Sequence, residues 1–206
     1  MLCLVEREIV LQEPRDKEMT NSEAGKRELE RLLSGIASGD RESLERLYEL
    51  TRTAVYGFAL SYLGSTHDAG DATQDTFVRI WSVSGQYKPQ GTPMAWIFTI
   101  CRNICLMKLR KSGREAYLDE NEWDAIPEDA ENITVEDRQI LHEAMKKLDE
   151  TERRIVIMHA VSGLKHREIA EELDMALATV LSKYRRALKK LKKHIEGGDP
   201  HEKSGG

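Results

Sequence analysis

Cysteine is scarce in this chain, with 3 residues among 206. So few cysteines cannot build the disulfide framework of a small secreted domain, and Cys3, Cys101 and Cys105 lack the paired spacing of a zinc site. Cys101 and Cys105 lie one helical turn apart among apolar residues, which favours reduced side chains in a core over a metal-binding pair. The sequence therefore predicts neither a disulfide-stabilised protein nor a metal centre.

Long hydrophobic runs are absent as well. No stretch approaches the roughly 18 apolar residues that a membrane span needs. The segment from Met1 to Leu11 is largely apolar, but Glu6, Arg7 and Glu8 interrupt it and no signal-peptide cleavage pattern follows. We therefore expect a cytoplasmic protein with no membrane insertion.

Common enzyme motifs are also missing. The chain contains no glycine-rich loop of the phosphate-binding kind, no HExxH sequence and no nucleophile elbow. His159 and His166 are isolated in the sequence, so a structural or solvated role is favoured over a catalytic one for both. We expect no enzymatic activity and no cofactor.

Helical periodicity dominates the chain, and strand patterns are nearly absent. A chain of 206 residues has room for one large or two small domains. Helices are predicted at 26–37, 41–63, 67–82 and 94–111, and a last bundle begins near Val135, with turns at 148–149 and 162–163. Asp149 and Glu152 have the spacing of a capping box. The predicted fold class is therefore all-α, with two small helical domains (26–112 and 135–196) joined by a flexible acidic linker (113–134) and flanked by loose tails (1–25 and 197–206).

Two of these helices are expected to supply much of the first core. Trp96 follows a polar loop, so a surface position is about as well supported for it as a core position. The side chains predicted to be buried are Leu44, Leu47, Tyr48, Val55, Phe58 and Leu60 from 41–63, and Ala72, Phe77, Ile80 and Trp81 from 67–82.

Charge is distributed unevenly along the chain. The formal net charge of -5 would argue against a nucleic-acid partner if the charge were spread evenly. However, residues 76–114 include seven basic and no acidic side chains, whereas residues 113–137 include ten acidic side chains and one arginine. The chain is basic, then acidic, then basic again, and the average conceals this order.

Residues 164–195 show the pattern of a helix-turn-helix. Ala170 supplies a small residue where two helices cross, Asp174 a turn residue that tolerates positive φ, and Val180 an apolar anchor in the second helix. One face of that second helix is apolar and is predicted to be buried against a small bundle. It consists of Leu177, Val180, Tyr184, Ala187, Leu188, Leu191 and Ile195.

The opposite face of the second helix is cationic. No acidic residue occurs between Met175 and Ile195, and a long face of one sign suggests a polyanionic partner. The position of the preceding turn suggests a DNA major groove. The alternative is a solvated basic helix that closes a bundle. This face carries Ser182, Arg185, Arg186, Lys189, Lys190 and Lys193.

A stripe of acidic residues lies along one side of the helix predicted at 67–82. Asp68, Asp71 and Asp75 fall within an arc of about 60° at helical spacing, with Gln74 at its edge. Carboxylates near a helix N-terminus are stabilised by the helix dipole, which is an alternative explanation for Asp68 and Asp71. Asp75 lies further along the helix and is explained less well in this way.

Aromatic and basic residues alternate between this helix and the next. Such a surface suits single-stranded nucleic acid, because a base stacked on an aromatic ring contributes about 1 to 3 kcal/mol and cations follow the backbone. The residues concerned are Trp81, Tyr87, Lys88 and Trp96, followed by Arg102, Asn103 and Arg110.

Three sets of motifs occur in order along the chain. They are Leu32-Leu33-x-Gly35-Ile36-Ala37-x-Gly39-Asp40 with Leu47-Tyr48 and Asp68-Ala69-x-Asp71-x-x-Gln74-Asp75-x-Phe77-x-x-Ile80-Trp81; Trp96-Ile97-x-x-Ile100-x-Arg102-Asn103 with Leu109-Arg110; and Glu168-Ile169-Ala170, Thr179-Val180-x-Ser182 and Arg186-Ala187. Together they resemble the bacterial RNA polymerase sigma factors of the extracytoplasmic-function (ECF) type, in the sigma-70 superfamily. The match covers about residues 29–191 in the right order, with the right linker.

This resemblance implies three partners: core RNA polymerase, promoter DNA and an anti-sigma factor. It implies strand opening on binding energy alone, because flipping a base costs only a few kcal/mol. The loop from Gln86 to Thr92 would capture a flipped base. Asp68, Asp71, Gln74 and Asp75 would bind the polymerase; Tyr87, Lys88, Trp96, Arg102, Asn103, Arg110 and Lys111 the minus-10 element; and Thr179, Leu181, Ser182, Lys183, Arg185, Arg186 and Lys189 the minus-35 element.

Two other classes of protein remain as alternatives. A response-regulator type transcription factor has a similar C-terminal helix-turn-helix, but it predicts a βα receiver domain that the helical N-terminal half lacks. A protein-interaction adaptor that uses the acidic helix and linker without binding DNA does not explain two separate basic faces.

Overall fold

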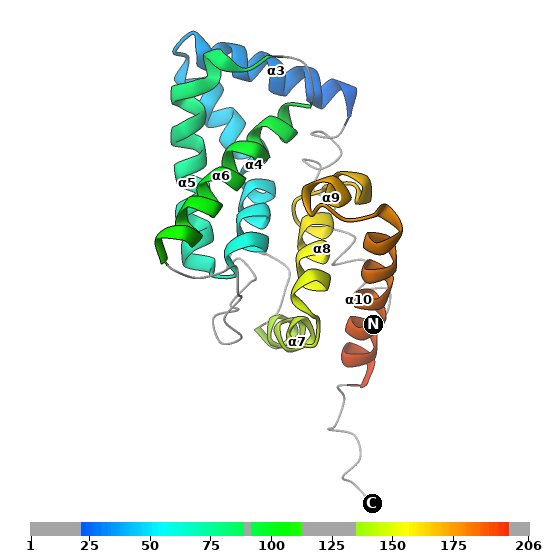
Figure 1. Cartoon of the computed structure of the whole chain (residues 1–206). Helices are drawn as coiled ribbons and strands as arrows, with labels where there is room; N and C mark the ends of the chain where they lie inside the picture. Colours follow the sequence, from blue (N-terminus) through cyan, green and yellow to red (C-terminus); the bar gives the residue numbers. More distant parts are fainter. Residues whose placement is uncertain (1–21, 89–91, 113–134, 198–206) are drawn as a thin grey trace, which may run out of the picture.

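The computed structural model describes residues 22–88, 92–112 and 135–197. Within these ranges the chain is helical and contains no strand, which confirms the predicted all-α class. In Figure 1 the earlier helices of the chain, coloured blue to green, form one half, and the later helices, coloured yellow-green to red, form the other. The helices are α3 (Glu23–Ala37), α4 (Arg41–Leu63), α5 (Thr66–Val83), the 3-10 turn η1 (Ser84–Gln86), α6 (Pro93–Ser112), α7 (Val135–Lys146), α8 (Glu150–Ala160), α9 (His166–Glu172) and α10 (Leu177–Gly197).

Polar side chains fix where the first three helices begin. Ser22, Asp40 and Ser65 each accept a hydrogen bond from a backbone N–H in the first turn of α3, α4 and α5, respectively. Because Ser22 caps α3, this helix begins at Glu23 rather than at the predicted residue 26, and residues 23–25 belong to a helix instead of a tail. Gly64 ends α4 with a φ of 69°, a conformation that glycine adopts without steric cost.

The first half packs around α4. Phe58 on α4 is fully buried and stacks on Phe98 of α6, with their ring centroids 4.6 Å apart. Cys101 and Cys105 are buried in the same core as free thiols, as predicted. A hydrogen bond with Cys101, together with burial, raises the pKa of the Cys105 thiol and keeps it protonated.

The second half is a bundle of α7, α8 and α10 with α9 against it. The predicted capping box at the start of α8 is present, because Asp149 accepts from the Glu152 N–H and Glu152 accepts from the Asp149 N–H. Val156 and Ile157 of α8 meet Ala187 and Leu191 of α10 in a small apolar cluster. This cluster holds the long C-terminal helix by its apolar face.

The two halves also share a continuous core, which the sequence analysis did not predict. In Figure 1, α8 stands beside the second half of α4. Ile155 and Met158 of α8 are fully buried in the same cluster as Val55 and Phe58 of α4. Four predicted segments lie wholly or partly outside the described residues: the N-terminal tail up to residue 21, residues 89–91 of the loop predicted to capture a flipped base, the acidic linker (113–134) and the tail beyond residue 197.

Four side chains predicted to be buried are instead 37 to 40% exposed: Tyr48, Trp81, Leu177 and Leu188. Tyr48, Trp81 and Leu188 each follow a fully buried residue, and at about 100° per residue they turn away from the core. Leu177 stands at the first position of α10, at the edge of its buried face. The remaining predicted core residues are buried or half-buried.

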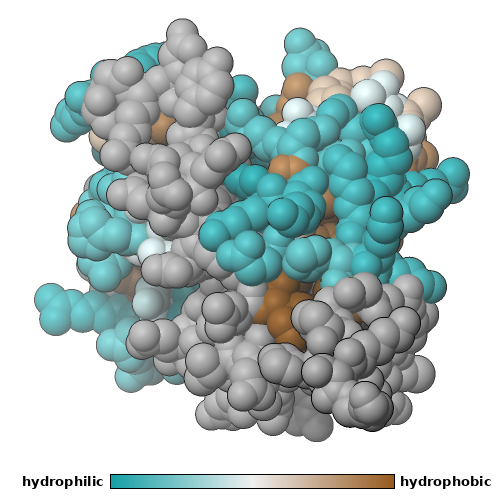
Figure 2. Space-filling model, turned by 90° about the horizontal axis from the view of Figure 1, so that it is seen from below, coloured by the Kyte–Doolittle hydropathy of each residue, from teal (hydrophilic) through white to brown (hydrophobic). Residues whose placement is uncertain are grey.

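The surface of the described residues is largely polar. Seen from below in Figure 2, most of the described residues in view are hydrophilic, and a narrower hydrophobic strip lies among them. Among the helices that the structure describes, none is long and apolar enough to cross a membrane. In the same ranges, no three His, Cys, Asp or Glu side chains gather closely enough to hold a metal ion.

Candidate nucleic-acid interface

α9 and α10 form the predicted helix-turn-helix. Asp174 in the turn has a φ of 51°, and the Met175 N–H donates to the carbonyl of Ala170 at 2.9 Å. Ala170 is buried where the helices cross, and Val180 is fully buried as the anchor of α10. All three residues therefore have the positions that their spacing predicted, including the left-handed conformation that aspartate tolerates better than most side chains.

The outer face of α10 presents most of the residues predicted to bind the minus-35 element. The guanidinium groups of Arg185 and Arg186 lie on this open face, which matches the cationic surface expected from the sequence. Thr179, Ser182, Arg185, Arg186 and Lys189 are exposed, whereas Leu181 and Lys183 are half-buried.

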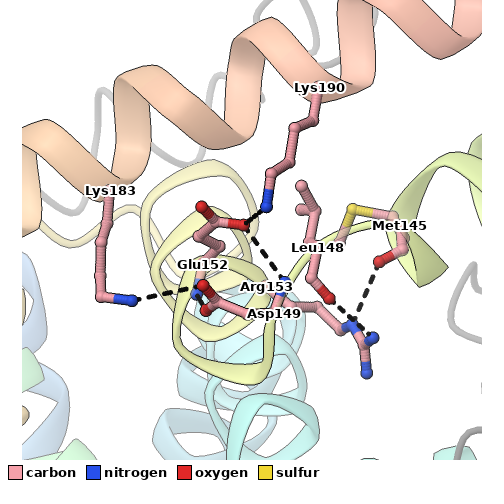
Figure 3. Close-up of polar contacts among 7 residues, drawn as sticks. All are labelled: Met145, Leu148, Asp149, Glu152, Arg153, Lys183 and Lys190. Carbon is pink, nitrogen blue, oxygen red and sulfur yellow. Dashed lines mark hydrogen bonds and ion pairs between the residues drawn. The ribbon is translucent and has the colours of Figure 1, made fainter.

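Two lysines of α10 turn toward α8 instead (Figure 3). The Lys190 ammonium donates to a carboxylate oxygen of Glu152 at 2.6 Å, and the Glu152 side chain is only 1% exposed. The Lys183 ammonium lies 3.4 Å from a carboxylate oxygen of Asp149. A hydrogen bond to a charged group contributes about 1.5 to 3 kcal/mol, so the bond from Lys190 to the buried Glu152 does most to fix how α10 sits on α8. The Asp149 side chain is 49% exposed, and its pair with Lys183 contributes about 1 kcal/mol or less. Lys183, a predicted DNA contact, has this second role in the free protein.

The same charges act on Asp149 itself. Burial alone would raise the pKa of its carboxyl, but the Glu152 N–H and the charge of Lys183 outweigh burial and hold the pKa below its ordinary value. Asp149 is therefore charged when it accepts from the first turn of α8 and meets Lys183.

Arg153 secures the turn before α8. Its guanidinium donates to the carbonyls of Met145 and Leu148, both at 3.2 Å (Figure 3). Met145 lies in the last turn of α7, and Leu148 lies just beyond that helix, in the turn that leads to α8. Arg153 thereby joins α7 to α8 beneath the lysine contacts of α10.

Three aromatic rings, one from each helix, also hold α8, α9 and α10 together. His159 and His166 lie with ring centroids 4.2 Å apart, and Tyr184 of α10 meets them edge-on at 5.0 and 4.7 Å. The Nδ1–H of His159 donates to the Leu164 carbonyl at 2.8 Å, while Nε2 of His166 is buried and has no hydrogen-bond partner among the described residues. Burial, with a smaller contribution from His159, lowers the pKa of His166.

This cluster predicts a pH dependence of stability. Below about pH 6.5 the unfolded chain protonates residue 166 while the folded chain resists protonation, so the free energy of unfolding falls as pH falls through this range toward the lowered pKa. His166→Asn should reduce the fall relative to the unmodified protein in thermal unfolding followed from pH 8 to pH 5. His67→Asn, at an imidazole 86% exposed on α5, controls for the loss of an imidazole. An unchanged pH slope in His166→Asn would contradict the prediction.

The outer face of α6 carries both aromatic and polar side chains. Trp96, Asn103 and Arg110 repeat at seven-residue intervals and so share one side of the helix. Trp96 is half-buried, with its ring edge-on to Tyr87 at 5.4 Å, and Met107, 49% exposed, lies on the same side. Met107 was not among the residues predicted for this face, although its four-residue spacing from Asn103 indicates the same side of the helix. Lys88, Asn103, Arg110 and Lys111 are exposed.

Arg102 lies apart from this stripe. Its Nε is 3.1 Å from a carboxylate oxygen of Glu172, at the end of α9. The structure therefore brings a residue predicted to bind the minus-10 element against the first helix of the helix-turn-helix.

The acidic stripe of α5 is also present. Asp71, Gln74 and Asp75 are exposed, while Asp68 is half-buried in the first turn. Asp75 lies 3.1 Å from the Lys108 ammonium of α6 and is still 55% exposed. The stripe is exposed from Asp71 to Asp75, and Lys108 of α6 contacts it at Asp75.

Comparisons with known proteins bear on both halves. Residues 47–115 match the family model "Sigma-70 region 2", and residues 138–191 match "Sigma-70, region 4". The first match covers the half in which a response regulator would have a receiver domain, so that alternative is not supported.

Named relatives agree with these matches. The ECF RNA polymerase sigma factor SigK of Mycobacterium sp. (strain KMS) is 28% identical over 173 residues, or 80% of this chain and 89% of that protein. The ECF sigma factor SigE of Mycolicibacterium smegmatis is 31% identical over 174 residues, or 77% and 65% of the two chains.

Solved structures show the same fold. The structure of CnrH in complex with the cytosolic domain of CnrY has a TM-score of 0.56 at 24% identity, and covers 82% of this chain and 98% of that chain. The sigma factor RpoE of Bartonella quintana, solved with the anti-sigma factor NepR, has a TM-score of 0.55 at 23% identity, with 75% and 98% coverage. From the two region matches and the named relatives, this chain belongs to the ECF sigma factors of the sigma-70 family.

Proposed function

We propose that this chain binds core RNA polymerase through the acidic stripe of α5, recognises the minus-35 element with α10 and opens the minus-10 element with α6 and the loop before it. The observation that carries this proposal is the division of cations on α10. Lys183 and Lys190 meet carboxylates of α8, whereas Arg185, Arg186 and Lys189 are exposed on the outer face. A helix held in this way can present a fixed row of donors to a major groove.

The division of labour on α10 leads to a prediction about Arg185 and Arg186. Arg185→Ala and Arg186→Ala should each weaken promoter binding by the holoenzyme without unfolding the chain, because both side chains are exposed. A lost base contact costs about 1 to 3 kcal/mol, whereas a lost phosphate contact lowers the salt slope by about one. Affinity measured across a salt series separates the two cases.

Lys192→Ala is the control for this measurement. Lys192 is exposed and cationic on the same helix, but lies about two turns closer to its C-terminus. It should change affinity far less. If both arginine variants bind and transcribe like the unmodified protein at every salt concentration, the outer face of α10 is only solvated.

The minus-10 assignment is supported by the α6 face. A half-buried Trp96 beside exposed Asn103, Met107 and Arg110 offers a stacking surface next to backbone-binding groups. The chain then stabilises opened strands by binding them, and we propose that it has no enzymatic activity of its own.

The third proposed partner is an anti-sigma factor. The two solved relatives described above are bound to the cytosolic domain of CnrY and to the anti-sigma factor NepR, respectively. We place the chain in the cytoplasm, where polymerase and promoter DNA are found. The acidic linker, which lies outside the described residues, would follow a basic channel of the polymerase rather than DNA.

A further inference from the structure

The end of α9 contacts α4 and α6 of the first half through one carboxylate. Glu172 accepts a hydrogen bond from the Tyr62 hydroxyl of α4 and lies 3.1 Å from the Arg102 guanidinium of α6. Its side chain is only 21% exposed. Burial, and then the bond to Glu172, raise the pKa of Tyr62, so its hydroxyl stays a neutral donor.

A second contact lies one helix away. Arg154 of α8 donates through Nε to the Ser61 carbonyl at 2.9 Å, and its guanidinium stands over the Tyr62 ring, 5.1 Å from the centroid. Glu150 accepts from the same guanidinium at 2.9 Å and orients it. Charged side chains of α8 and α9, Arg154 and Glu172, therefore both contact the C-terminal end of α4.

A glycine makes this approach possible. Gly57 lies inside α4, and a Cβ there would stand 2.5 Å from Cγ1 of Val161 at the end of α8. Such a distance is far inside van der Waals contact, and Cβ of Val161 would lie only 2.8 Å away, so with any larger residue Val161 and the end of α8 must shift. Glycine is unfavourable in the interior of a helix, and the close packing of α8 against α4 explains why this position is nevertheless a glycine.

We propose that Glu172 occupies Arg102 in place of a DNA phosphate, so that the contact of α9 with Arg102 and the contact of Arg102 with promoter DNA exclude each other. This inference rests on the proposed function, in which Arg102 binds the minus-10 element. Both a carboxylate and a phosphate pair well with a guanidinium. The outer face of α10 stays exposed in this arrangement, as do Asn103 and Arg110 of α6, so the contact with Glu172 occupies Arg102 selectively.

The test compares two pairs of single variants of the full chain without polymerase. Glu172→Gln removes the competing charge, and Glu171→Gln changes an exposed neighbour on the same helix. Gly57→Ala places a Cβ between α4 and α8 and should push them apart. Gly70→Ala is its control, because a Cβ at residue 70 meets nothing within 4 Å. Alanine favours helix over glycine, so opening in Gly57→Ala cannot come from a weakened α4.

Two readouts are needed. Small-angle X-ray scattering reports whether the chain opens, and fluorescence anisotropy reports binding to a labelled single-stranded DNA 12-mer. Glu172→Gln and Gly57→Ala should bind this strand about three- to tenfold more tightly, the range expected for a lost partly buried ion pair and hydrogen bond. Adding Arg102→Ala to Glu172→Gln should remove the gain. The Gly57→Ala chain should also have the larger radius of gyration.

The outcomes are distinguishable. Variants that open without a gain in strand binding would overturn the competition, as would a Gly57→Ala chain that stays as compact as the unmodified protein. If the holoenzyme nevertheless initiates transcription, the proposed function stands and only the competition is wrong. If instead opening occurs and the holoenzyme also fails to use any promoter, the assignment of Arg102 to DNA fails with the proposed function.

Discussion

Replacing Asp68, Asp71 and Asp75 together with asparagine is expected to abolish stable binding of the chain to core RNA polymerase. All three side chains lie on one side of α5, and Asp71 and Asp75 are exposed. Close charge pairs in protein interfaces contribute about 1.5 kcal/mol or more each, so losing three should weaken association by about 100-fold or more. The DNA affinity of α10 should not change, because the substitutions lie in the other half. Pull-down and titration with purified core measure the effect.

The chain contains a matched control for this variant. Glu42, Glu45 and Glu49 on α4 have the same spacing, are exposed, and also begin in the first turn of their helix. Glu49 pairs with Arg46 at 2.8 Å, much as Asp75 pairs with Lys108. Changing these three to glutamine should leave core binding intact. Undiminished recovery of core by the asparagine variant would favour a helix-dipole role for the stripe.

Trp96→Ala is expected to leave closed-complex formation nearly intact but to reduce open complex by about tenfold, because a base stacked on an aromatic ring contributes about 1 to 3 kcal/mol. Permanganate reactivity of thymines near the start site measures the open complex. A promoter with a pre-melted, mismatched segment should rescue the variant, since the cost of unstacking is already met.

Trp96 also packs against Tyr87, so a loss of stability must be separated from a loss of strand capture. Trp96→Phe keeps an aromatic ring at the site and should retain more open complex than Trp96→Ala. The thermal stability of each free protein serves as the reference. Lower stability of Trp96→Ala together with no rescue by the mismatch would assign this ring to packing alone.

The predictions from sequence succeeded where the determining interaction is local. The Asp149 and Glu152 box, the positive φ of Asp174 and the bounds of α4 all depend on residues within a few positions of one another. Buried faces were predicted less well at their edges. Tyr48 and Trp81 each follow a fully buried residue, and apolar character alone does not show on which side of the edge a side chain falls.

Contacts between distant segments could not be predicted. Lys190 and Glu152 are 38 residues apart, and Tyr62 and Glu172 are 110 apart. A one-sided cationic helix shows which face avoids the core, but not which lysines meet carboxylates of another helix. Arg102 illustrates the same point, because its pattern predicts an anion as partner, and both a phosphate and Glu172 meet that requirement.

The most direct test of the account is run-off transcription with purified core RNA polymerase and a pool of genomic promoter fragments, with transcript ends mapped by sequencing. We predict that the chain directs core to a limited set of start sites sharing sequences near minus 35 and minus 10. The Asp68, Asp71 and Asp75 variant should lose these transcripts, and the Glu42, Glu45 and Glu49 variant should keep them. Transcript ends no different from those of core alone would contradict the account.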